Sequence, residues 1–183
     1  MRNTFISSVI AGCLLLGANL AQAQELKPRP SPNAEVKQQI GTVMVTVAYS
    51  SPGVKKRKIW GDLVPDGKLW RTGANASTKL TFSKDVTVGG KPVPAGTYSL
   101  LTIPTGKSWT IILNKNTELG ANVDQRKPEQ DVANFTVAPK AAPMRERLTF
   151  IFSDTTDESA NLDLEWEKVR VSIPIAVAAA KKS

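Results

Sequence analysis

The stretch "NLDLEWEKVRVSIPI", residues 161–175, decides the fold class. Apolar residues stand at even positions from Leu162 to Trp166 and at odd positions from Val169 to Ile175, with polar or charged residues between most of them. A two-residue period puts alternate side chains on opposite faces of a strand. The pattern therefore predicts two successive strands, 161–167 and 169–175, each with one apolar face.

The same alternation recurs along the chain, between segments rich in glycine and proline. Gly89-Gly90 is typical of a hairpin turn, and residues 115–130 offer at most one helical turn. Many short strands without an amphipathic helix predict one all-β domain, an antiparallel β-sandwich or jelly roll with little or no helix. Further strands are expected at 43–49, 78–82, 86–88, 97–103, 109–114, 131–137 and 148–153.

The first 23 residues have the features of an export signal. Arg2 precedes an apolar run that extends to Leu20, and the run ends in Ala21-Gln22-Ala23, a small-residue cleavage pattern. We expect cleavage after Ala23 and export to the periplasm or the extracellular space. Lipidation at Cys13 is an alternative, although it leaves little apolar sequence before the cysteine.

This interpretation divides the chain into four parts. A signal peptide (1–23) precedes a proline-rich linker (24–33), the β-sandwich domain (34–175) and a flexible basic tail (176–183). Cleavage removes the one cysteine in the chain, so the exported protein cannot form an internal disulfide. About 160 residues suit a single domain that folds without covalent cross-links.

Composition excludes several kinds of chemistry. The chain has no histidine, which removes the usual neutral-pH base and most zinc or copper sites. The acidic stretch 154–158 matches no calcium loop, and no glycine pattern is typical of a nucleotide fold. We expect neither a metal nor a cofactor.

The charge of the chain bears on its partners. It carries 24 Lys+Arg against 16 Asp+Glu, a formal net charge of +8. These cations are scattered, apart from the runs 55–58 and 181–182. Peripheral contact with an anionic envelope is a partner that this charge permits, whereas export argues against nucleic acid.

Residues 49–78 hold the best candidate site. Trp60 and Trp70 offer large apolar faces, and Arg71 offers a planar fork of donors suited to a carboxylate or phosphate. Gly73 lets the backbone turn so that amides face an anion, and Asn75 adds a donor and an acceptor. A purely structural alternative stays open: Arg71 pairs with Asp62 or Asp85, and the tryptophans close the core.

The run "YSSPGVKKRKIWGDLVPDGKLWRTGAN", with "KPVPAGTYSL", "WTIILNKN" and "LDLEWEKVRVSIPI", resembles the secreted bacterial family known as domain of unknown function 2911. The resemblance spans about Pro32 to Ile175 and implies an exported bacterial β-rich domain without an assigned activity. The positions that match its motif are Tyr49, Ser50, Pro52, Lys55, Arg57, Gly61, Asp62, Leu63, Val64, Pro65, Trp70, Arg71, Thr72, Gly73, Ala74, Asn75 and Thr78.

The chain departs from the family pattern in two respects. It has Ser51, Lys56 and Asp66 where arginine, glycine and tyrosine are usual. It also lacks the aromatic residues usual after the "ILN" strand. If those aromatics wall a pocket in relatives, the pocket of this chain is more open or takes a different ligand. The positions concerned are Leu119, Val123 and Gln125.

Three functions are compatible with these features. The leading hypothesis is a non-catalytic module that binds a small polar ligand, anionic or carbohydrate. Its ligand-binding residues would be Tyr49, Arg57, Trp60, Trp70, Arg71, Thr72, Gly73 and Asn75. The alternatives are a hydrolase of envelope glycans that uses Asp62 and Asp66, and a structural envelope scaffold.

Overall fold

The computed structural model describes residues 28–177. The expected signal peptide, the Cys13 alternative and most of the basic tail lie outside the described residues. The strands are β1 (Asn33–Ile40), β2 (Val43–Ser50), β3 (Thr78–Phe82), β4 (Val86–Val88), β5 (Lys91–Val93), β6 (Gly96–Pro104), β7 (Trp109–Asn114), β8 (Asp131–Val137), β9 (Lys140–Ser153) and β10 (Ser159–Val177). Two single turns of 3-10 helix, η1 (Val123–Gln125) and η2 (Pro128–Gln130), stand between β7 and β8.

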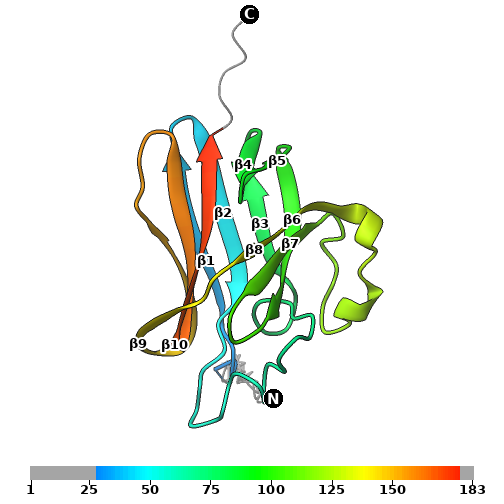
Figure 1. Ribbon diagram of the computed structural model, residues 1–183, viewed down its shortest axis with the longest axis vertical. Coiled ribbons are helices and arrows are strands. Elements are labelled where there is room, and N and C mark those ends of the chain that lie inside the picture. Colours follow the sequence, from blue (N-terminus) through cyan, green and yellow to red (C-terminus); the bar gives the residue numbers. More distant parts are fainter. Residues whose placement is uncertain (1–27, 178–183) are drawn as a thin grey trace, which may run out of the picture.

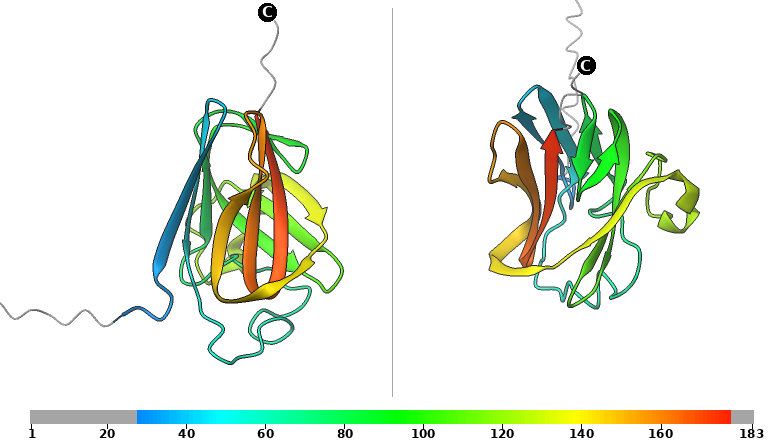
Figure 2. Two further views of the ribbon diagram at one scale, coloured as in Figure 1. Left: turned by 90° about the vertical axis from the view of Figure 1, so that its left-hand side faces the viewer. Right: turned by 45° about the horizontal axis from the view of Figure 1, so that its top comes forward.

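The strands form two antiparallel sheets that pack face to face (Figure 1). One sheet has six strands in the order β1-β2-β3-β6-β7-β8, and the other has four in the order β5-β4-β10-β9. Between β8 and β9 the chain passes from the first sheet to the second through only residues 138 and 139 (Figure 2). The predicted all-β sandwich is confirmed.

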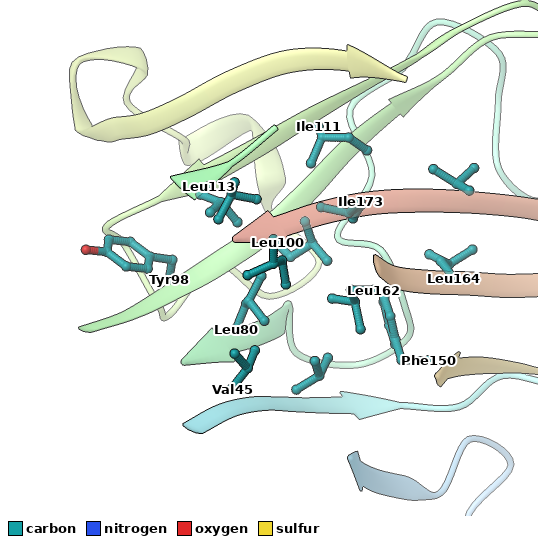
Figure 3. Close-up of a cluster of buried hydrophobic side chains, with 14 of the residues drawn as sticks. Val45, Leu80, Tyr98, Leu100, Ile111, Leu113, Phe150, Leu162, Leu164 and Ile173 are labelled. Atoms are coloured by element: carbon teal, nitrogen blue, oxygen red, sulfur yellow. The ribbon is translucent and has the colours of Figure 1, made fainter. Parts of the chain in front are cut away.

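The core lies between the two sheets. Figure 3 shows inward-facing side chains of both, among them Leu80 and Leu100 from the six-stranded sheet and Leu162 from β10. All three are fully buried, so the alternating apolar faces read from the sequence meet as expected. Among residues 28–177, no helix is long and apolar enough to cross a membrane.

The prediction of two strands in 161–175 is wrong, because β10 is one strand. Its pairing with β9 is irregular on both sides of Glu167, whose backbone has a φ of 55°. An irregularity of this kind shifts the two-residue alternation by one position. Trp166 and Val169 therefore both face the core although they are three residues apart.

The first strand begins earlier than predicted. The domain was expected from residue 34 with its first strand at 43, but β1 begins at Asn33 and pairs along its whole length with β2. Glu35 and Lys37 are exposed on this strand, which is the charged character usual in an edge strand. That polar pattern conceals the strand in the sequence.

Candidate functional site

The segment between β2 and β3 closes one end of the sandwich, opposite the end at which β10 finishes (Figure 1). Its second half runs beside β6: the Gly67 N–H donates to the Pro104 carbonyl at 2.7 Å, and Trp70 exchanges two backbone hydrogen bonds with Thr102. Residues 67–71 therefore lie along the same edge of β6 as β3, beside the part of β6 that β3 does not reach. Residues 72–77 are an excursion from this line, and we call them the 72–77 loop.

The 72–77 loop is held in a strained conformation. Thr72 has a φ of 57° and Asn75 a φ of 60°. Asparagine tolerates a positive φ, but such an angle is unusual for threonine, whose side chain is β-branched. Thr72 is fully buried, and its carbonyl accepts a hydrogen bond of 2.7 Å from the Thr78 hydroxyl. The Thr78 N–H donates to the Arg71 carbonyl, which closes the base of the loop. Such over-determined strain is often found at functional sites.

Gly73 is required by close approach and not by a left-handed backbone. A Cβ at this position would lie 3.0 Å from the Thr78 Oγ1 and 3.2 Å from the Ser50 carbonyl oxygen. The Gly73 carbonyl accepts a hydrogen bond of 3.1 Å from the Trp70 indole. The glycine thus packs the loop onto the end of β2.

Four tryptophans pack together beneath this segment. Trp60, Trp70, Trp109 and Trp166 have ring centroids 5.0 to 6.2 Å apart in five of their pairs, mostly edge to face. These separations are favourable for aromatic rings. Trp70 is 8% exposed, so its indole is part of the core and offers no open face to a ligand.

Trp60 is half-buried and lines a hollow of about 130 Å³ together with Trp109 and Asp66. The indole N–H of Trp60 is shielded from solvent and has no hydrogen-bond partner in the described part of the chain. Asp62 is exposed and is not among the lining residues. The two carboxylates considered for a hydrolase therefore do not face one another across this hollow.

Arg71 lies in a different environment from its neighbour Trp70. Adjacent side chains of an extended segment point to opposite faces, so Arg71 lies on the outer face of the six-stranded sheet. Its Nε is buried without a hydrogen-bond partner, and none of the ion pairs within residues 28–177 includes it. Burial lowers the pKa of this guanidinium below its ordinary value.

The carboxylates considered as partners of Arg71 are engaged elsewhere or solvated. Asp85 accepts a hydrogen bond of 2.9 Å from the Ala95 N–H, and Asp62 is exposed. A partly desolvated cation without a counter-charge is costly in a folded protein. The arrangement suits an anion supplied from outside the chain.

A hollow of about 520 Å³ lies beside the 72–77 loop, on the outer face of the six-stranded sheet. The loop supplies Ala76 and Ser77 to its wall, and strands β1, β2 and β3 supply the rest. This volume falls in the usual range for small-molecule sites. The lining residues are Asn33, Ala34, Glu35, Ala48, Tyr49, Ser50, Ala76, Ser77 and Lys79.

Asn75 holds the loop against the rim of this hollow. Its side-chain amide donates to the Ser50 Oγ at 3.2 Å and to the Ser31 carbonyl at 3.3 Å. Ser50 in turn donates to the Asn33 Oδ1 at 3.2 Å. The amide therefore links the loop, β2 and the start of β1 in one polar network.

The remaining predicted site residues are dispersed. Tyr49 lines the hollow, although its ring packs edge-on against Phe150 and its hydroxyl accepts a bond from the Phe150 N–H. Arg57 is exposed and donates to the Gly53 and Val54 carbonyls. Tyr49 thus lines one hollow, and Asn75 bonds to Ser50 in the wall of the same hollow. Trp60 lines the other hollow, and the interior holds Trp70, Thr72 and Gly73.

A family model described as "Protein of unknown function (DUF2911)" matches residues 31–175, which is most of the chain. The chain belongs to the DUF2911 family. No curated protein and no solved structure matches it.

Two DUF2911 positions that depart from the expected pattern, Leu119 and Val123, have a clear structural role in this chain. They pack with Leu101 and Ile112 into a small apolar cluster, against which Leu69 also lies. The Leu119 carbonyl accepts a hydrogen bond of 2.9 Å from the Ser77 N–H. These residues therefore cover the outer face of β6 and β7 and support the 72–77 loop.

The residues that β1 and β3 bring to the 520 Å³ hollow were not predicted from the sequence. Asn33 was assigned to the linker, and neither Glu35 nor Lys79 was among the predicted site residues. The available signal for β1 was the position of Glu35, Lys37 and Gln39 at every second residue, which is the period of a strand. It indicates a strand, but not which strand lies beside it.

Proposed function

We propose that the protein is a non-catalytic module that binds a small polar ligand, anionic or carbohydrate, in the hollow beside the 72–77 loop. One observation carries the proposal: the strained loop forms a wall of a hollow large enough for a sugar or a small acid. The loop is fixed from three sides by Ser50, Thr78 and Trp70. A rigid wall lowers the entropy lost when a ligand binds.

The chemistry of the wall suits hydroxyl and carboxylate groups. Lys79 can donate from its ammonium group, and Glu35 can accept hydrogen bonds. The hydroxyls of Ser50 and Ser77 also line the hollow but are bonded within the chain. Three lining residues are alanines, whose small side chains leave space in the hollow: Ala34, Ala48 and Ala76. Alternating polar and apolar contacts of this kind match the two faces of a sugar ring.

Arg71 supports the choice of an anionic ligand, although it is not a lining residue. It stands at the base of the loop with no counter-charge among residues 28–177. Lys79 is a second cation on this side of the sheet, and it also pairs with the exposed Glu118. We therefore expect an acidic sugar to bind more tightly than its neutral counterpart.

Titration calorimetry with glucuronate and with glucose tests the proposal. Ala48→Phe should fill the hollow and abolish the heat of binding, because Ala48 lies on its floor. Thr46→Phe is the matched control, since Thr46 lies on the same face of β2 but does not line the hollow. Equal binding by both variants would place the ligand elsewhere and refute this site.

Lys79→Met separates the two ligand classes. The variant should bind glucose as the unaltered protein does but should lose its preference for glucuronate. Absence of heat with either ligand in the unaltered protein would reject both classes for this hollow.

A further inference from the structure

The residues Lys55-Lys56-Arg57-Lys58, which we call the basic turn, adopt a backbone that lysine rarely takes. Lys55 has a φ of 48° and Lys56 a φ of 60°, and the Arg57 N–H donates to the Val54 carbonyl at 2.9 Å. Two successive positive φ angles define a type I′ turn, whose preferred residues are Asn-Gly. Lysine at both central positions strains the turn.

Contacts from β9 hold the basic turn in place. The Lys55 N–H donates to the Glu146 Oε1 at 2.9 Å, and the Val54 N–H donates to the Glu146 carbonyl at 2.8 Å. Gly53 forms an isolated bridge with Arg147. The turn is therefore fixed by residues about ninety positions away in the sequence, and it is not a freely flexible loop.

The four cations of the basic turn are exposed and have no carboxylate partner in the described part of the chain. The bridge with Gly53 places a further exposed cation, Arg147, beside them. Glu146 is the acid in contact with the turn, and one of its oxygens is occupied by the Lys55 N–H. Asp62 and Asp66 follow on the same segment, so the cations outnumber the acids there.

An exposed apolar side chain stands beside these cations. The Leu63 N–H donates to the Lys58 carbonyl at 3.4 Å, and Leu63 is 43% exposed. The segment lies at the end of the molecule, away from the faces of both sheets (Figure 1). Cations grouped around an exposed leucine at a projecting end are the usual features of a surface that contacts a membrane.

We propose that the basic turn and Leu63 dock the protein onto an anionic lipid surface. The cations bind lipid headgroups and the leucine enters the headgroup layer, a contact that a soluble polyanion does not provide. The strained lysines are then explained, because Asn-Gly would relax the turn and lose the charge. This surface is separate from the hollow beside the 72–77 loop, since the two share no residue.

Sedimentation with lipid vesicles tests the proposal. The protein should start at Gln24, because the apolar residues 5–20 would themselves bind lipid, whereas residues 28–177 contain both complete sheets. Vesicles of phosphatidylglycerol with phosphatidylcholine should bind it, and vesicles of phosphatidylcholine alone should not. Each lysine near an anionic surface strengthens binding about fivefold, so Lys55→Asn/Lys56→Gly should weaken it about 30-fold.

A matched control is Lys84→Asn/Lys91→Asn, which removes the same charge from exposed positions near the β4–β5 hairpin. The control should bind vesicles as the unaltered protein does. Leu63→Ser should reduce vesicle binding and leave binding to soluble dextran sulfate unchanged. The Lys55→Asn/Lys56→Gly variant should also melt a few degrees higher, because its turn is relaxed.

Three results would overturn the proposal. Equal loss in the control would mean that overall charge, and not the basic turn, drives binding. No effect of Leu63→Ser, with binding to dextran sulfate as tight as to vesicles, would identify a polyanion surface instead of a lipid surface. Absence of vesicle binding by the unaltered protein at low salt would exclude lipid docking altogether.

Discussion

Trp70 and Arg71 are adjacent in the sequence and have opposite environments. The Trp70 indole is buried among three other tryptophans, and its N–H is bonded to the Gly73 carbonyl. The Arg71 guanidinium lies on the other face of the same segment, half-buried and without a partner among the described residues. The comparison shows that one short motif contains a residue that stabilises the fold and a residue that destabilises it unless something binds.

The inner and outer sides of the segment that contains Trp70 and Arg71 therefore differ in what they contact. The inner side joins the sheets through packed aromatic rings, and the outer side presents polar groups and a hollow. Mutations on the inner side should lower the stability of the fold, whereas mutations on the outer side should leave it nearly unchanged or raise it. Four substitutions test this difference, from the largest expected effect to the smallest.

Trp70→Ala should lower the free energy of unfolding by about 3–5 kcal/mol, because it leaves a cavity among the remaining three tryptophans. Urea denaturation followed by tryptophan fluorescence measures the loss. Trp70→Phe is the control and should lose less, since it keeps an aromatic ring in place. A loss below about 1 kcal/mol for the alanine variant would show that the cluster is not a principal source of stability.

Gly73→Ala should lower the free energy of unfolding by about 1–3 kcal/mol. Its Cβ would meet the Ser50 carbonyl and the Thr78 hydroxyl, and the Ser50 backbone cannot yield easily. Gly106→Ala is the control, because no atom lies within 4 Å of a Cβ there. Equal stabilities for the two variants would mean that the 72–77 loop is less tightly packed than the structure indicates.

Arg71→Met should raise the free energy of unfolding by about 0.5 kcal/mol. The methionine removes a partly desolvated cation, and the gain is small because the Arg71 side chain is only partly buried. Arg57→Met is the control and should be destabilising, since Arg57 donates to two backbone carbonyls. A clear loss of stability in Arg71→Met would contradict the unpartnered state of Arg71.

Lys79→Met should also change the ionisation of Glu118, with little effect on stability. Hydrogen bonds from Lys79 and Thr117, with the charge of Lys79, lower the pKa of Glu118 below its ordinary value. The stabilisation that this provides is present above the ordinary pKa and is lost as the pH falls through the lowered one. Carboxyl-carbon NMR titration should show the pKa of Glu118 rising in Lys79→Met and staying unchanged in Lys84→Met.

Much of the fold could be predicted because alternation is a local signal. The strands at 78–82, 109–114 and 131–137 have the expected bounds, since each has apolar residues at a two-residue period. The irregularity at Glu167 was harder to detect. The apolar alternation shifts by one position there, and such a shift looks the same in the sequence whether a strand ends or continues through a bulge. The strand β1 was missed because most of its side chains are polar or charged.

The candidate site was predictable only in part. The sequence marked residues 70–75 by their composition, and the structure shows that the loop formed there lies beside a hollow. The sequence did not show which of those residues point inward, because their orientation depends on the pairing of residues 67–70 with β6. It also did not show that Glu35 and Lys79 line the same hollow, because they come from strands 44 residues apart in the chain.

The sequence by itself determined the all-β class, most strand positions and the absence of histidine chemistry, since these follow from the period and the composition of the chain. Only the tertiary structure decided that Trp70 is buried while Arg71 has no partner among residues 28–177. It also decided that Glu146 holds the strained turn through Val54 and Lys55. The physical reason is that burial and charge pairing depend on segments distant in the sequence, whereas strand alternation depends on near neighbours.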